Sequence, residues 1–92
     1  MFQVEITSRA KKDIESLDSG IAHRVLQKLT WLGENAHQIS HDALQDLPEH
    51  LQGTYKYRVG DYRVLYKIDH IKRVIIITGV IPRKEKYRRL RR

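Results

Sequence analysis

Lysine and arginine alternate with tyrosine and valine along residues 55–68, which read YKYRVGDYRVLYKI. Alternate side chains of an extended strand point to opposite faces, and the central Gly-Asp is a two-residue turn signal, so the segment is expected to fold as a hairpin with one cationic face. The cations of that face are Lys56, Arg58, Arg63 and Lys67. Like charges opposed across two strands cost about 0.2–1 kcal/mol per pair. A bound phosphate backbone would offset that cost; the alternative is a face whose cations only keep one side of the sheet in water.

Two further residues of the types that recognise RNA follow the last apolar strand. Arg83 can bind a phosphate, and the ring of Tyr87 can stack on an unpaired base. Both come within a few residues of a strand end, so they are expected at one rim of the same cationic surface. Lys67, Lys84 and Lys86 are expected to add contacts to the RNA backbone.

Positive charge is concentrated in the second half of this 92-residue chain, whose net charge is +7. Residues 1–52 carry five Lys/Arg against eight Asp/Glu, whereas residues 53–92 carry thirteen against three. Such asymmetry favours an anionic partner for the second half, with nucleic acid the leading candidate. The alternative is a basic surface that only aids solubility.

The composition also excludes several classes of protein. The chain has no cysteine, which excludes disulfides and cysteine-ligated zinc and is compatible with a reducing compartment. No apolar run approaches the roughly 20 residues that span a bilayer, and the first residues lack the apolar core of a secretion signal. We therefore expect a cytoplasmic protein without a membrane partner, folded as one domain over residues 1–92.

The spacing of the apolar residues predicts an α+β fold that would hold these cations in place. An N-terminal strand precedes a helical hairpin, and a three-stranded antiparallel meander then completes a four-stranded sheet. Trp31 is expected in the core or at its rim. The predicted elements are, in order, a strand over 2–7, helices over 8–17 and 21–33, a loop with one short turn over 34–53, strands over 54–59, 62–68 and 73–80, and a short basic helix or tail over 83–92.

The segment LQGTYKYRVGDYRVLYKI, followed by an apolar strand and PRKEKY, resembles the RelE/ParE toxin superfamily of type II toxin–antitoxin systems. The resemblance covers nearly the whole chain and implies a RelE-like, microbial ribonuclease-type fold. For the RelE-like branch it implies an mRNA interferase, a ribosome-dependent endoribonuclease that cuts mRNA in the A site. For the ParE-like branch it implies a non-catalytic inhibitor of DNA gyrase. A third interpretation is a degenerate member that binds only its antitoxin and DNA.

The resemblance to the RelE-like branch also assigns roles to single residues. Lys56 would be the general base, Arg63 and Arg83 would stabilise charge on the phosphoryl oxygens, and Tyr87 would stack on the nucleotide. All five residue types of the branch are present, which favours the nuclease. The implied catalytic set is Lys56, Arg58, Arg63, Arg83 and Tyr87.

The same resemblance implies the partners. They are a cognate antitoxin protein, mRNA in the ribosomal A site and 16S rRNA, with operator DNA bound only through the antitoxin complex. No small-molecule cofactor and no metal are implied. Several members carry a histidine immediately before the Arg83 position, where this chain has Pro82. The histidines of this chain lie outside the matched motif and are expected to be surface or loop residues: His23, His37, His41, His50 and His70.

Overall fold

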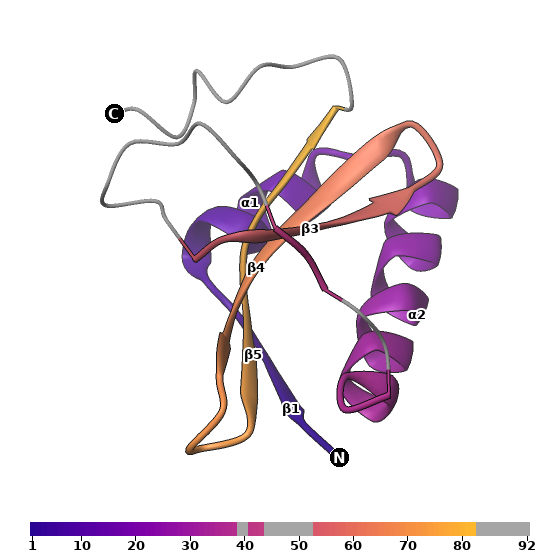
Figure 1. Cartoon of the computed structure of the whole chain (residues 1–92). Helices are drawn as coiled ribbons and strands as arrows, with labels where there is room; N and C mark the ends of the chain where they lie inside the picture. The colour runs from indigo at the N-terminus through magenta and orange to yellow at the C-terminus, as the bar shows by residue number, and fades with distance from the viewer. Residues whose placement is uncertain (39–40, 44–52, 83–92) are drawn as a thin grey trace.

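A five-stranded sheet with two helices on one face forms the part of the chain that the computed structural model describes, residues 1–38, 41–43 and 53–82 (Figure 1). The strand order is β1-β5-β4-β3-β2. Strand β1 runs parallel to β5, and the other neighbouring strands are antiparallel. The elements are β1 (Gln3–Ile6), α1 (Ser8–Glu15), α2 (Ser19–Asn35), β2 (Asp42–Ala43), β3 (Tyr55–Val59), β4 (Tyr62–Asp69) and β5 (Val74–Pro82).

The α+β prediction is confirmed, with the four predicted strands and both helices in the predicted order. Helix α2 extends to Asn35, two residues past the predicted end at Gly33. Strand β2 is an addition that sequence patterning could not give, because two residues cannot display an alternation. The predictions for residues 44–52 and 83–92 fall outside the described residues.

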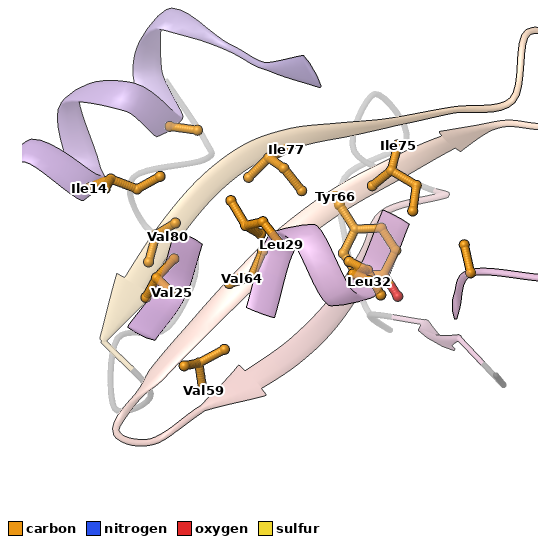
Figure 2. Packing of buried hydrophobic residues seen from close by; sticks show 12 residues of the cluster. Ile14, Val25, Leu29, Leu32, Val59, Val64, Tyr66, Ile75, Ile77 and Val80 are labelled. Carbon is orange, nitrogen blue, oxygen red and sulfur yellow. The ribbon is translucent and has the colours of Figure 1, made fainter. Parts of the chain in front are cut away.

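Both helices pack on the tyrosine and valine side of the sheet. Helix α1 begins directly after Thr7, whose Oγ1 accepts a hydrogen bond from the Ala10 backbone N–H at 3.2 Å. Figure 2 shows the core as side chains of both helices laid over β3, β4 and β5. None of the helices in the described ranges is long and apolar enough to cross a membrane. The buried cluster comprises Ala10, Ile14, Val25, Leu29, Leu32, Ala36, Val59, Val64, Tyr66, Ile75, Ile77 and Val80.

Beyond the end of β1, a buried carboxylate accepts a backbone hydrogen bond from the edge of β5. The last backbone bond between this edge and the β1 segment runs from the Thr7 N–H to the Ile77 carbonyl at 3.0 Å. Farther along β5, the Val80 N–H donates instead to Asp13 Oδ2 of α1, also at 3.0 Å. Asp13 is only 5% exposed. Helix α1 is therefore fastened to the sheet by a charge-assisted hydrogen bond as well as by apolar packing.

Replacing Asp13 with alanine is expected to lower the free energy of unfolding by about 1–3 kcal/mol, because the buried Val80 N–H would lose its acceptor. The measurement is urea denaturation followed by circular dichroism. Asp13→Asn is the matched control, since its amide oxygen can still accept this bond. Equal midpoints for Asp13→Ala and the unmodified chain would contradict the anchoring role.

Candidate nucleic-acid interface

The predicted cations of β3 and β4 lie on the sheet face opposite the helices. We call this the cationic face after its positively charged residues, Lys56, Arg58, Arg63 and Lys67. By register, Glu5 of β1 and Asp69 of β4 lie on the same face, toward the end away from the hairpin tip. Arg58 and Arg63 are direct partners across the two strands. Their Cβ atoms therefore lie about 4.5–5.5 Å apart, a spacing at which two like charges repel. A phosphate held between two such guanidinium groups would remove the repulsion and accept several hydrogen bonds.

The centre of the cationic face is apolar and buried. Leu65 lies on it between the cations, and Ile81 of β5 lies directly opposite Arg63. A register shift after Leu65 produces this arrangement: β5 carries one extra residue there, so Val80 turns into the core and Ile81 turns to the cationic face. Arg63 thus stands beside a buried apolar side chain, where its interaction with an anion is stronger than in water.

The cations differ in their exposure to solvent. Arg58 is exposed and donates from Nε to the Gly60 carbonyl at 3.2 Å, which directs its guanidinium toward the hairpin tip. Gly60 has a φ of 59°, so it is suited to the tight turn that places this carbonyl there. Lys56, Arg63 and Lys67 are half-buried. Among these four cations, the one most accessible to solvent is therefore Arg58, next to the tip of the β3–β4 hairpin.

The remaining predicted site residues belong to the segment after β5. Strand β5 ends at Pro82, which pairs with Tyr62 at the start of β4. The chain therefore leaves the sheet at the hairpin-tip end, one register position past the partner of Arg63. The site residues that lie outside the described part of the chain are Arg83, Lys84, Lys86 and Tyr87.

The histidines that the structure describes lie away from the cationic face. His41 is half-buried, and its ring nitrogens lie 2.9 Å from the Ala36 carbonyl and 2.7 Å from the Tyr66 hydroxyl. A carbonyl can only accept, so in the neutral ring Nε2 carries the proton and Nδ1 accepts from the tyrosine. His41 therefore ties the end of α2 to β4, a structural role that no sequence motif indicated. The exposed histidines are His23, His37 and His70, as predicted.

Sequence reasoning also missed the environment of Trp31. Its ring stacks on that of Tyr57 at a centroid distance of 6.0 Å and an interplanar angle of 26°. This stack connects α2 to β3, the strand that carries Tyr57. The spacing of Trp31 on its helix indicated a place at the rim of the core, but the partner on a strand 26 positions away carried no local signal.

Comparison with known proteins identifies the family. Residues 4–87 match the family described as the ParE toxin of the type II toxin-antitoxin system, parDE. A sequence search of curated proteins found no match.

Solved structures of RelE toxins share the fold. The RelBE2 toxin–antitoxin complex of Mycobacterium tuberculosis contains a chain with 28% identity and a TM-score of 0.73, and the match covers 89% of this chain and 98% of that one. The isolated E. coli RelE toxin has 22% identity and a TM-score of 0.72, with 94% and 88% covered. The archaeal RelE–RelB complex of Pyrococcus horikoshii OT3 contains a chain with 26% identity and a TM-score of 0.66. That match covers 92% of this chain and 98% of the archaeal chain.

The family match spans most of the chain, and the sheet and helices are those of RelE toxins. This chain therefore belongs to the ParE toxin family of the RelE/ParE superfamily and is a toxin of a type II toxin–antitoxin system.

Proposed function

We propose that this toxin is a ribosome-dependent endoribonuclease that cuts mRNA in the A site. The observation that carries the proposal is the pairing of Arg58 with Arg63 across the cationic face, beside a buried apolar centre. Two guanidinium groups in neighbouring strands suit a phosphate, whose oxygens accept hydrogen bonds from both. If the cations only kept this sheet face in contact with water, placing two arginines directly across from each other would add repulsion and no stability.

The proposed reaction uses the 2′-hydroxyl of the message as its nucleophile. The 2′-oxygen attacks the adjacent phosphorus, the bond from phosphorus to the 5′-oxygen breaks, and the products are a 2′,3′-cyclic phosphate and a 5′-hydroxyl end. Lys56 is the candidate base for the 2′-hydroxyl proton. Arg63 donates to the phosphoryl oxygens, on which negative charge grows in the transition state. An arginine stabilises the departing 5′-oxygen as its charge partner, and water supplies the final proton.

The proposal extends to residues beyond the end of β5. Arg83 is assigned a second set of bonds to the phosphoryl oxygens, and Tyr87 is assigned stacking that holds the backbone in line for attack. Lys67, Lys84 and Lys86 are assigned contacts to the RNA backbone. These assignments rest on the resemblance of PRKEKY to the family motif and on the direction in which β5 leaves the sheet.

The proposed partners follow from the same function. The host cell must keep such a toxin inactive. The similar chain from Mycobacterium tuberculosis belongs to the RelBE2 toxin–antitoxin complex, and the one from Pyrococcus horikoshii OT3 belongs to a RelE–RelB complex. We propose a cognate antitoxin for this chain, mRNA and 16S rRNA as the targets, and operator DNA only through the antitoxin complex. The site of action would be the cytoplasm, where translation occurs.

Inhibition of DNA gyrase is the second candidate function, because the matching family carries the ParE name. One paired assay separates the two. The purified toxin is added to a translating extract and, at the same concentration, to a gyrase supercoiling reaction. The proposed function requires shortened transcripts and normal supercoiling. Full-length transcripts together with blocked supercoiling would reverse the assignment.

A further inference from the structure

An exposed stripe of two cations and a tryptophan runs along α2, outside the cationic face. Arg24, Lys28 and Trp31 follow one another at spacings of four and three, so they share one side of the helix. The two cations are exposed, and Trp31 is 40% exposed although it is the largest side chain of the protein. We call these three residues the α2 stripe.

The tryptophan of the α2 stripe is held in a fixed position. Its ring stacks on Tyr57 as described above, and the Lys28 ammonium lies over the ring, 5.9 Å from its centroid. A core-filling role would bury this ring, and an aliphatic side chain would cover Tyr57 equally well. A rigid, partly exposed indole with a flexible lysine over its ring can instead exchange the ammonium for a nucleobase, and the displaced lysine can then bind the phosphate of that nucleotide.

The α2 stripe continues the cationic face around the hairpin tip. The Arg24 guanidinium lies 3.6 Å from the point that a Cβ on Gly60 would occupy. Arg58 of the cationic face reaches the same residue, with Nε 3.2 Å from its carbonyl oxygen. Arg24 and Arg58 therefore meet at the tip from the two sides of the sheet. The cations of the α2 stripe and of the cationic face approach each other at Gly60, next to the exposed Asp61.

We infer that the α2 stripe is a second RNA-binding surface, which takes a single-stranded segment through stacking on Trp31 and phosphate contacts to Lys28 and Arg24. Arg24 and Trp31 are seven residues apart on α2, which corresponds to about 10 Å along the helix axis. The inference concerns binding alone, so it does not depend on whether the cationic face cuts RNA.

The only tryptophan of the chain is Trp31, so its fluorescence reports on this surface directly. The full chain is titrated at low salt with a single-stranded 2′-O-methyl RNA oligonucleotide, which lacks the attacking hydroxyl and cannot be cut. Stacking should quench the tryptophan emission in step with binding. With the RNA labelled instead, fluorescence anisotropy should show Trp31→Ala binding about 5- to 150-fold more weakly, the range expected for losing one stacked base. Trp31→Phe should recover most of this loss.

The cations are tested by their salt dependence. Arg24→Ala and Lys28→Ala should each lower the slope of log affinity against log salt by about 0.7, the value for one phosphate contact on a single strand. Lys72→Ala is the matched control, since it removes one exposed lysine from the turn at the other end of β4. The slope of log affinity against log salt for Lys72→Ala should lie closer to that of the unmodified chain than the slopes for Arg24→Ala and Lys28→Ala do.

Three results would overturn the inference. The first is unquenched tryptophan emission at saturating RNA. The second is equal RNA affinity for Trp31→Ala and Lys72→Ala. The third is equal quenching by polyglutamate, which would make the stripe a surface for an acidic protein. Because the oligonucleotide cannot be cleaved, failure of the nuclease proposal would leave each of these readouts unchanged.

Discussion

Replacing Arg63 with alanine is expected to lower the rate of mRNA cleavage in a translating extract by about 100- to 1000-fold, the cost of removing one donor to a developing oxyanion. Arg63 is half-buried, faces Arg58 across the hairpin and stands beside the buried Ile81. Its hydrogen bonds to a phosphoryl oxygen would therefore form next to a low-dielectric centre, where they contribute most in the transition state.

Two variants make this test specific. Arg63→Lys keeps the charge but loses the planar pair of donors, so it should recover only a small part of the activity. Lys72→Ala removes a cation from an exposed turn far from the hairpin tip and should cut like the unmodified toxin. Melting temperatures should show that all three variants fold. Unimpaired cleavage by a folded Arg63→Ala protein would remove the cationic face from the mechanism.

Replacing Leu32 with alanine is expected to lower the free energy of unfolding by about 2–5 kcal/mol, through lost burial and the cavity left behind. Leu32 is 0% exposed and lies in the cluster beside Tyr66 (Figure 2). Domains of this size have only about 5–15 kcal/mol in total, so the loss is a large fraction of the stability. Chemical denaturation measures it, and the melting temperature should fall by at least about 8 °C.

Leu26 provides the matched control on the same helix. It is 44% exposed, so Leu26→Ala removes the same atoms from a site that is still in contact with water. Its effect should be well below that of Leu32→Ala, within about 1 kcal/mol. Similar losses at the two positions would mean that α2 does not pack through the face that carries Leu32.

The sequence predicted the fold well because burial and local pattern agree along most of the chain. Residues 55–59 and 62–68 alternate, with Leu65 the exception among the cations, and the tyrosine and valine side of each strand faces the helices in the structure. Strand β2 and the extra residue of β5 were missed for a physical reason. Both depend on pairing with a distant strand, and neither changes the local spacing of apolar residues.

The candidate site was predictable only in part. The alternation of residue types predicted that Arg58 and Arg63 share one face, because successive side chains of a strand point to opposite faces of the sheet. It did not indicate that Ile81 would lie opposite Arg63, because that position depends on the bulge. The α2 stripe was hidden for a similar reason: the residue that holds Trp31 in place, Tyr57, belongs to another element.

Mapping the 5′ ends of transcripts from a translation reaction, with and without the protein, shows whether the toxin cuts messages as they are translated. We expect new 5′ ends within the reading frame, spaced by codons. These ends should disappear when initiation is blocked or when Arg63→Ala replaces the toxin. Identical 5′ ends with and without the toxin, in a reaction that it still arrests, would rule out the proposed cleavage.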